Sequence, residues 1–302
     1  EMLLDGTMDN LDGIITPTIC DTLRPMSQNF RVAMGDKMSV IFLAHPQNRF
    51  EDFGLEFCVD QYDHVKKELE KVAGKEITSE DIWNAIKVYN ESRAARREFV
   101  KLANEHCDVI TATKRSAVLK AFWFMEKPAY TAMLKELNAE LKALPVCDWK
   151  GTKVVTSGII CDNPKLLAAF EENNIAIAAD DVAHESRSFK TDVPMDEKCP
   201  MMALAKQFAN MDHDVLLYDP KSSENRRGEF VANLVKESGA QGLVLFMQQF
   251  CDPEEMEYPY LKKALDDAKI PHIKLGIDQQ MRDFGQANTA IQAFADVLEM
   301  SK

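Results

Sequence analysis

The second half of the chain alternates short apolar runs with longer amphipathic stretches, and this pattern constrains the fold more than any other feature. The runs at 153–157 and 242–246 are apolar with almost no polar alternation. Such runs are typical of strands buried on both faces, and strands separated by helices form parallel sheets. We therefore expect residues 146–302 to form a doubly wound α/β domain with helices on both faces of its sheet.

The pattern places five strands and five helices in this domain. The strands are expected at 153–157, 175–179, 214–218, 242–246 and 272–277, and the helices at 164–172, 197–210, 225–237, 253–268 and 285–299. Ligands of doubly wound sheets bind at the carboxyl ends of the strands. The residues that follow each strand are therefore the first candidates for a functional site.

The first 145 residues divide into a short α/β part and a helical part. Apolar runs at 13–20 and 38–44 predict two strands within a domain at 1–52, and apolar residues three and four apart predict helices over 53–145. The expected fold class is α/β, with two Rossmann- or flavodoxin-like domains that have parallel sheets and an intervening helical segment. Because residue 1 is Glu and not Met, a first domain that lacks its N-terminal part is left open.

Charge and composition exclude several classes of partner. The formal charge of −13 and the lack of any Lys/Arg-rich block disfavour nucleic acid and anionic membranes. Apolar runs fall far short of the roughly 20 residues that span a bilayer, and no signal-peptide pattern opens the chain. Neither GxGxxG nor GxxxxGK[ST] occurs, so we expect no nicotinamide bound in the usual mode and no ATP hydrolysis. A cytoplasmic protein is expected.

Seven cysteines are spread along the chain without a CxxC pair, which favours free thiols, metal ligands or catalysis over a disulfide framework. Two of them follow predicted strands as Cys20-Asp21 and Cys251-Asp252. A thiolate there is stabilised by the positive end of the next helix, and Asp is a good N-cap. The alternative for each cysteine is a small buried apolar residue, and zinc is disfavoured because close Cys/His pairs are lacking.

Several segments together resemble a known family over nearly the whole chain. They are Cys20-Asp21, Asp180-Asp181 followed by Glu185-Ser186-Arg187, the FCDPEE sequence at 250–255, and the DQQ at 278–280 that leads to 286–294. These segments resemble the iron–sulfur subunits of 2-hydroxyacyl-CoA dehydratases and the related benzoyl-CoA reductases. The ending at 278–287 is more similar to the smaller, β-type subunit.

The resemblance implies an oxygen-sensitive heterodimer used in anaerobic amino-acid fermentation. Each subunit of the family carries a [4Fe–4S] cluster on three cysteines, and a separate ATP-dependent iron–sulfur activator donates one electron. The enzyme is a lyase that removes water from an (R)-2-hydroxyacyl-CoA through a ketyl radical to give an (E)-2-enoyl-CoA. Such a cluster is needed because the proton at C3 is not acidic and no side chain supplies a low-potential electron.

The resemblance also assigns the cluster ligands. Cys20 and Cys251 match the first and last cysteine ligands, and Cys58 is the expected middle ligand, with Cys161 in reserve. The remaining cysteines, Cys107, Cys147 and Cys199, are interpreted as structural or surface residues.

The predicted strand at 175–179 delivers further polar residues to the same edge. Glu185, Ser186 and Arg187 are the candidate catalytic residues. Arg187 can hold a carboxylate or phosphate by paired hydrogen bonds, and a structural salt bridge to Asp180 or Asp181 is the alternative. His184 is a weaker acid–base candidate, because a loop histidine bonded to the backbone is more common.

Three other functions remain open from the sequence. A benzoyl-CoA reductase-type subunit would reduce an aromatic ring instead of removing water. A non-catalytic subunit would relay an electron or act as a scaffold while its partner binds the acyl-CoA. A two-domain binder of small molecules would hold no metal and would use its cysteines as core residues.

Overall fold

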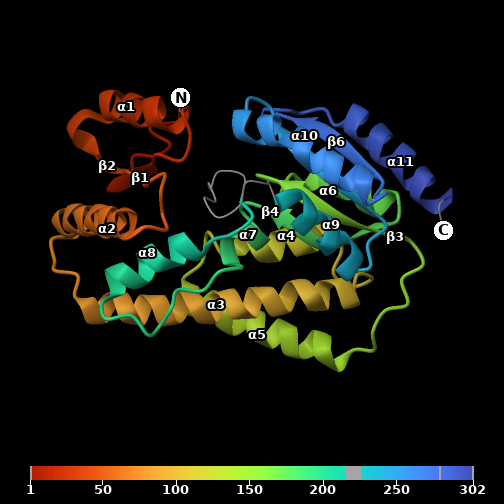
Figure 1. Ribbon diagram of the computed structural model, residues 1–302, viewed down its shortest axis with the longest axis horizontal. Coiled ribbons are helices and arrows are strands. Elements are labelled where there is room, and N and C mark those ends of the chain that lie inside the picture. Colours follow the sequence, from red (N-terminus) through yellow and green to blue (C-terminus); the bar gives the residue numbers. More distant parts are fainter. Residues whose placement is uncertain (1, 215–225, 279, 301–302) are drawn as a thin grey trace. The chain divides into compact units, whose positions relative to one another are not determined.

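The computed structural model describes residues 2–214, 226–278 and 280–300, and the chain folds into two compact units (Figure 1). The first unit takes the residues up to 87 together with 193–212. The second takes 88–192 and most of the chain from 213 onward. The division falls inside helix α3 (Ser79–Glu105). None of the helices in the described part of the chain has the length and apolar character needed to cross a bilayer.

The first unit contains a small parallel sheet. Strand β1 (Gly13–Pro17) pairs with β2 (Ser39–Leu43), and α1 (Leu23–Met34) with a short 3₁₀ turn connects them. Helices α1 and α2 (Asp52–Ala73) lie on opposite sides of these strands (Figure 1). The two strands predicted within 1–52 are therefore confirmed, and they run parallel as expected.

Helix α8 (Pro200–Asn210) packs with the first unit although it lies between two strands of the second unit in the sequence. It lies against α2, and the Arg49 guanidinium donates to the carbonyl oxygens of Phe208 at 3.0 Å and Ala209 at 3.1 Å. The boundaries expected at 52 and 145 mark where the sequence changes between α/β and purely helical segments. The two units of the structure are instead groups of elements that pack together. Packing groups this helix with the N-terminal residues.

The second unit is built on a four-stranded parallel sheet in the order β4-β3-β5-β6. Its strands are β3 (Thr152–Gly158), β4 (Ile175–Val182), β5 (Gly242–Gln248) and β6 (His272–Ile277). Its flanking helices are α6 (Pro164–Glu172), α7 (Ser186–Phe189), α9 (Arg227–Glu237), α10 (Asp252–Asp267) and α11 (Gly285–Met300). This confirms the α/β class, while the strand expected at 214–218 lies almost wholly outside the described residues.

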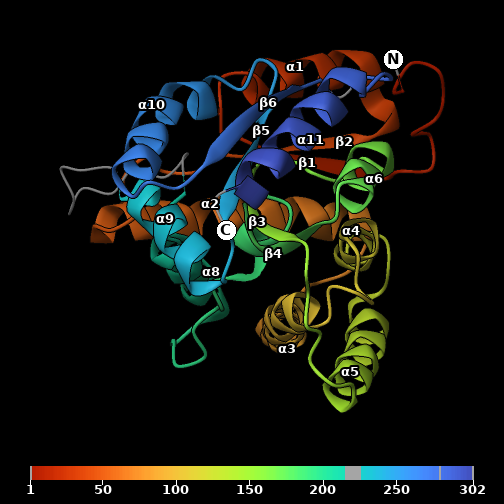
Figure 2. The same cartoon turned by 90° about the vertical axis from the view of Figure 1, so that its right-hand side faces the viewer.

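Both faces of this sheet are covered, as the apolar strands require (Figure 2). Helices α6 and α11 bury one face in a core that includes Phe170, Phe246 and Ile291. Helices α9 and α10 bury the other face around Leu243 and Leu261. The sheet is therefore doubly wound, because strands buried on both sides need apolar residues at nearly every position.

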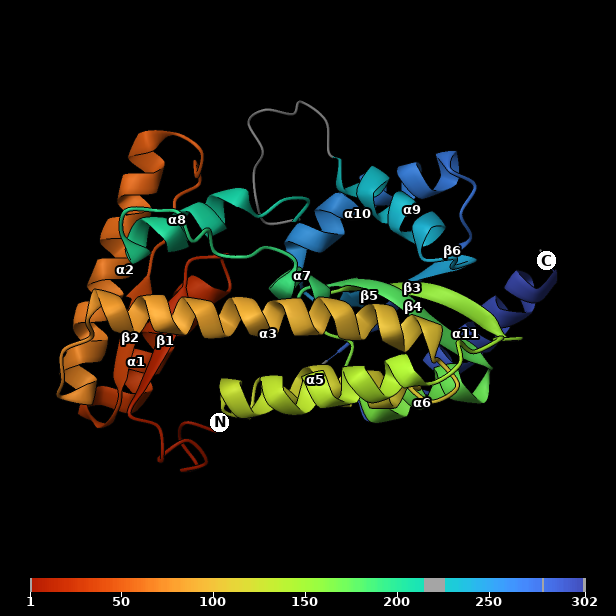
Figure 3. The ribbon, with the colours of Figure 1, turned by 90° about the horizontal axis from the view of Figure 1, so that it is seen from below.

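A helical layer completes the second unit. The part of α3 from residue 88 runs beside α5 (Lys127–Ala143) (Figure 3), and α4 (Ala112–Ala121) lies next to them (Figure 2). Their buried core includes Phe99, Leu119 and Leu134. The guanidinium of Arg96 stacks 3.7 Å from the ring centroid of Phe122, and burial lowers the pKa of Arg96 to about 10. Helices predicted over 53–145 are thus present.

The carboxyl ends of β3 and β5 form the topological switch point of the sheet. From β3 the chain passes through α6 on one face, and from β5 it passes through α10 on the other. Ligands of doubly wound sheets bind at such a point. Gly158 ends β3 with φ +141°, and a Cβ there would lie 2.4 Å from the carbonyl oxygen of Phe246. Only glycine fits this close approach.

Candidate functional site

A cluster of buried charges lies at the carboxyl edge of the second unit's sheet, and we call it the buried charge cluster. It consists of three arginines, Arg115, Arg187 and Arg227, and five acids, Asp180, Asp181, Glu185, Glu254 and Glu257, all of them buried. They come from α4, the end of β4, α7 and the starts of α9 and α10. Long-range folding therefore brings them together.

Arg115 organises one half of this cluster. Its guanidinium pairs with the carboxylates of Asp180 and Glu185. Asp180 also accepts hydrogen bonds from the Ser186 hydroxyl at 2.5 Å and from the backbone N–H groups of Val182 at 3.1 Å and Ser186 at 2.9 Å. These bonds fix the turn that follows β4, because the strand-end carboxylate satisfies the turn's own backbone donors.

Arg227 organises the other half from the first turn of α9. Its Nε and Nη2 donate to one oxygen of Asp181 at 3.1 and 2.8 Å, and Nη2 also donates to the Ser157 hydroxyl at 2.9 Å. Its Nη1 pairs with Glu257 on α10. This arginine therefore joins α9 and α10 to the ends of β3 and β4.

Arg187 makes the third connection, and its partners are protein atoms. Its Nη2 donates to the carbonyl oxygen of Gly158 at 2.5 Å and to Glu254 at 3.0 Å, while Nε donates to the Asp181 carbonyl at 3.1 Å. The nearest Asp181 carboxylate oxygen is 3.8 Å away. The sequence left two roles for Arg187, binding of a ligand carboxylate or phosphate and a structural salt bridge. In the structure its guanidinium is bonded to protein atoms, and its carboxylate partner at 3.0 Å is Glu254.

The five buried acids of the cluster outnumber its three arginines, and a sixth carboxyl, that of Asp214, lies 3.6 Å from Nη1 of Arg187 at the edge of the cluster. Burial raises the pKa of Glu185, with the charge of Asp180 adding to it, and burial likewise raises the pKa of Glu254. One oxygen of Glu254 has no hydrogen-bond partner among the described residues. Leaving such an oxygen ionised is costly, so protonation is easier at Glu185 and Glu254 than at a solvent-exposed glutamate.

The arginines keep their charge for the opposite reason. Burial alone would lower the pKa of the Arg115 guanidinium, but the carboxylates of Asp180 and Glu185 overcome this effect and raise it. Burial alone would also lower the pKa of Arg227, but the carboxylates of Asp181 and Glu257 raise it overall. The carboxylates of the cluster therefore keep Arg115 and Arg227 positively charged in spite of their burial.

The predicted catalytic residues Glu185, Ser186 and Arg187 meet in this cluster, and each bonds to a neighbour there. The Nδ1–H of His184 donates a hydrogen bond to the Ile159 carbonyl at 3.1 Å, which matches the backbone-bonded alternative. A substrate role for the three residues stays a prediction. Arg115 and Arg227 were not identified from the sequence as members of the site. The only signal for them was an arginine that lies among the apolar residues of a predicted helix.

Cys251 lies three residues beyond the end of β5, next to the switch point. It is the N-cap residue of α10 and is partly exposed. Its N–H donates to the Gln248 carbonyl at 3.1 Å and its carbonyl accepts from the Glu255 N–H at 3.0 Å. The preceding Phe250 has φ 66° and is 82% exposed. A non-glycine residue in this conformation carries strain of about 1–3 kcal/mol, as is common near functional sites.

Cys20 occupies the corresponding junction of the first unit. It is partly exposed in the turn between β1 and α1. The N-cap of α1 is Thr22, and that of α10 is Cys251, so the expectation that Asp21 and Asp252 act as N-caps is wrong. Asp252 instead lies in the first turn of its helix, where a carboxylate is favoured by the helix dipole.

The two candidates for the middle ligand are both buried. Cys58 on α2 has a pKa raised by burial, which a hydrogen bond with Tyr62 partly opposes. Cys161 follows β3, and burial raises its pKa well above the ordinary value, with Glu185 adding to the effect. Within the described residues no three His, Cys, Asp or Glu side chains gather as a metal-binding group. The choice between Cys58 and Cys161 stays open.

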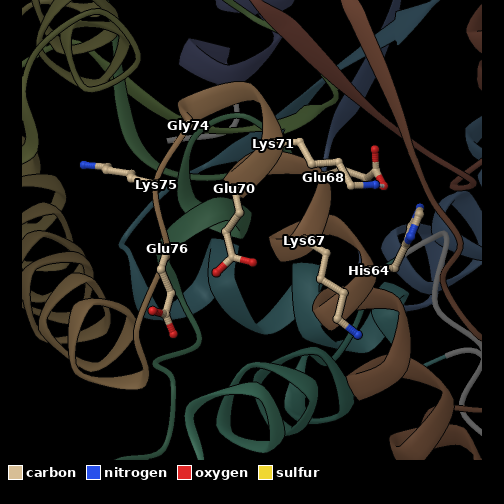
Figure 4. Close-up of a pocket in the computed structure, with 8 residues that line it drawn as sticks. All are labelled: His64, Lys67, Glu68, Glu70, Lys71, Gly74, Lys75 and Glu76. Atoms are coloured by element: carbon tan, nitrogen blue, oxygen red, sulfur yellow. Dashed lines mark hydrogen bonds and ion pairs between the residues drawn. The ribbon is translucent and has the colours of Figure 1, made fainter.

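A hollow on α2 is the other candidate, and its lining is made of ordinary surface charges (Figure 4). It includes Lys67 and Lys71, which pair with Asp63 at 2.6 Å and Glu68 at 2.5 Å along the same helix. Exposed pairs of this kind contribute little and mark a solvated helix face. The carboxyl edge of the second unit is therefore the stronger candidate site.

Comparison with known proteins decides the family. The family model described as 2-hydroxyglutaryl-CoA dehydratase, D-component, matches residues 1–298. The chain belongs to this family. It is 62% identical over 298 residues to the (R)-2-hydroxyglutaryl-CoA dehydratase subunit beta of Acidaminococcus fermentans, with 99% of this chain and 79% of that protein covered. This confirms the resemblance predicted from the sequence.

Two further relatives show the breadth of the family. The chain is 42% identical to the (R)-phenyllactyl-CoA dehydratase beta subunit of Clostridium sporogenes, over 99% of this chain and 78% of that protein. It is 24% identical to one subunit of the benzoyl-CoA reductase of Thauera aromatica, again over 99% of this chain and 78% of that protein. The dehydratase subunits are thus much more similar to this chain than the reductase subunit is.

Proposed function

We propose that this chain is the β-type subunit of an (R)-2-hydroxyacyl-CoA dehydratase, a lyase that forms an (E)-2-enoyl-CoA by loss of water through a ketyl radical. The observation that carries the proposal is the family match over residues 1–298 together with 62% identity to a beta subunit named for (R)-2-hydroxyglutaryl-CoA. Relatives named for phenyllactyl- and lactoyl-CoA share the same reacting group, a hydroxyl beside the thioester carbonyl. (R)-2-hydroxyglutaryl-CoA is the first substrate to test.

The proposed cofactor is a [4Fe–4S] cluster bound by Cys20, Cys251 and a third cysteine, Cys58 or Cys161. Cys20 and Cys251 fit this role because each is a partly exposed thiol at a strand-to-helix junction, one in each unit. The start of α10 favours the thiolate form of Cys251 that binds iron. When bound, the cluster would supply the low-potential electron that side chains cannot.

The buried charge cluster supports this proposal by fixing the helix that begins at Cys251. Glu254 and Glu257 in the first turns of α10 are held by Arg187 and Arg227, which also bond to the ends of β3 and β4. The start of α10 is therefore clamped to the sheet edge. We infer that the arginines position Cys251 and do not themselves contact the substrate.

The partners proposed are an α-type subunit, an ATP-dependent iron–sulfur activator and the acyl-CoA. Three relatives are named as beta subunits, which supports the first of these. One observation favours the alternative of an electron relay or scaffold. The terminal nitrogens of Arg115 donate to protein carboxylates, and Arg187 donates to protein carbonyls and a carboxylate, so these groups are already engaged within the fold. Acyl-CoA would then bind mainly to the partner subunit.

The first experiment measures iron and sulfide in the complex with its partner subunit, purified without oxygen. We expect about four irons per β-type chain and a broad visible absorption band, with both lost in Cys20→Ala and Cys251→Ala. The third ligand is identified by which of Cys58→Ala and Cys161→Ala also loses iron. Cys199→Ala is the matched control, because Cys199 is exposed at the start of α8. Folded protein with unchanged iron in all variants contradicts the proposal.

A second experiment separates the enzyme classes. The complex and its activator are assayed with 2-hydroxyacyl-CoA esters and with benzoyl-CoA, with and without this chain. We expect dehydration that requires the chain and no reduction of the aromatic ring. Protection of the isolated chain from proteolysis by acyl-CoA would contradict the relay alternative.

A further inference from the structure

Two cysteines that the proposed cluster does not use lie in contact in the second unit. Cys107 follows the end of α3, and Cys147 lies in the segment between α5 and β3. Their side chains are close enough for the Cys147 thiol to influence the pKa of Cys107. The backbone N–H of Cys147 also donates to the Glu105 carbonyl at 2.9 Å, which holds this segment against the end of α3. Two separate contacts therefore bring the cysteines together.

We propose that Cys107 and Cys147 are a dithiol site that closes reversibly to a disulfide, distinct from the proposed iron site. The interpretation of both residues as merely structural or surface cysteines does not account for their contact. Among the described residues they do not belong to any group of three potential metal ligands. Two neighbouring thiols that have no third metal ligand beside them are suited to forming an S–S bond.

The accessibility of the two thiols gives the order of reaction. Cys147 is partly exposed, whereas Cys107 is only 4% exposed. With a small disulfide as oxidant, the Cys147 thiolate attacks one sulfur, forms a mixed disulfide and releases one small thiol. Cys107 then attacks the Cys147 sulfur, loses its proton to the second leaving thiolate and completes the S–S bond. Two protein thiols and one small disulfide thus give one protein disulfide and two small thiols.

The second step is expected to be slow and to quicken with rising pH. Burial raises the pKa of Cys107 to about 11, although the charge of Lys153 opposes this shift. The Lys153 ammonium is held by the carbonyl and side-chain oxygens of Asn104, both at 2.8 Å. A cation fixed beside the buried sulfur stabilises the thiolate that the second step requires.

The disulfide would close a chain loop that contains α4 and α5. This loop includes Arg115, which holds two acids of the buried charge cluster. Closing a loop restricts the unfolded chain more than the folded one. We therefore expect oxidation to raise the midpoint of thermal unfolding of the second unit by roughly 5 °C.

The test uses the full chain, purified anaerobically and equilibrated with mixtures of reduced and oxidised glutathione. Free thiols are then blocked, and the protein is digested with trypsin without reduction. The expected tryptic peptides at 102–114, 143–150 and 199–206 each contain a single cysteine, namely Cys107, Cys147 and Cys199. We expect a cross-linked pair of the first two that disappears on reduction and is absent in Cys147→Ser. Cys199 serves as the exposed control.

The result that overturns the proposal is folded protein in which Cys147 carries only glutathione or a blocking group while Cys199 is fully glutathionylated. A Cys20→Ala variant distinguishes the iron site from the dithiol site. It should lose iron if the cluster is bound as proposed, and it should still form the 107–147 cross-link. Mass spectrometry and iron analysis therefore report on the two sites independently.

Discussion

The two Cys-Asp junctions share a sequence but differ in what holds them. Cys251 begins α10, and the next turns of that helix carry Glu254 and Glu257, which are bonded to buried arginines. Cys20 precedes α1, which has no acidic residue in its first turn, and neither N-cap, Thr22 nor Cys251, makes a capping bond with its side chain. The dipeptide therefore marks a strand-to-helix junction in both units, but it does not determine how firmly the junction is held.

The difference follows from the two sheets. In the second unit β5 is buried along almost its whole length, because helices cover both faces. In the first unit β1 is buried only at Thr16, and Ile15 within it is 42% exposed. A strand buried on both sides fixes the residue that follows it through many contacts. We therefore expect Cys251 to be the more rigid of the two candidate ligands.

The largest expected effect comes from removing the arginine that holds Asp180 and Glu185. Arg115→Ala leaves both acids buried without their cation and should lower the free energy of unfolding by about 3–5 kcal/mol. The matched control is Lys120→Ala on the same helix, whose pair with Asp162 is partly exposed and should contribute under about 1 kcal/mol. Denaturant titration of both variants measures the difference. Equal losses would mean that the cluster does not hold the second unit together.

A second prediction concerns the pH dependence of stability. Because the pKa of Glu254 is raised in the folded state, its contribution is fully present below the ordinary value of 4.5 and is lost as pH rises through the folded value. Glu254→Gln keeps an acceptor for Arg187 and cannot ionise. The unfolding free energy of the wild type should therefore fall relative to this variant as pH increases above 4.5.

Urea titrations over a series of pH values test this prediction. Glu255→Gln is the matched control, because Glu255 is on the same helix and its side chain is 48% exposed. It should leave the pH profile unchanged. A Glu254→Gln profile parallel to that of the wild type would contradict a raised pKa of Glu254 in the folded state.

The smallest expected effect compares the aspartates of the two junctions. Asp252→Ala removes a carboxylate from the first turn of α10 and should cost about 0.3–1 kcal/mol through the helix dipole. Asp21 is exposed and lies before the N-cap of α1, so Asp21→Ala should cost less. Thermal unfolding of the paired variants measures both. A larger loss of stability in Asp21→Ala than in Asp252→Ala would mean that the junction at Cys20 is the more firmly held of the two.

Particular residues show how far the sequence predicts the site. The positions of Cys20 and Cys251 after strands follow from local apolar runs, and Asp180 and Asp181 at the end of β4 follow in the same way. Arg115 comes to Asp180 from 65 positions away, so no local pattern indicates their pairing. Helix α8 likewise has a clear helical pattern, but nothing local indicates that it packs beside α2.

By itself, the sequence determined the family, the α/β class and the strand ends at which the candidate residues lie. These depend on local periodicity and on motifs whose residues are close together in the chain. Only the tertiary structure decided which charges are buried together, which unit α8 joins and that Cys107 meets Cys147. Those contacts join distant segments, and their energies depend on burial and on the partner that each group finds, which no single segment contains.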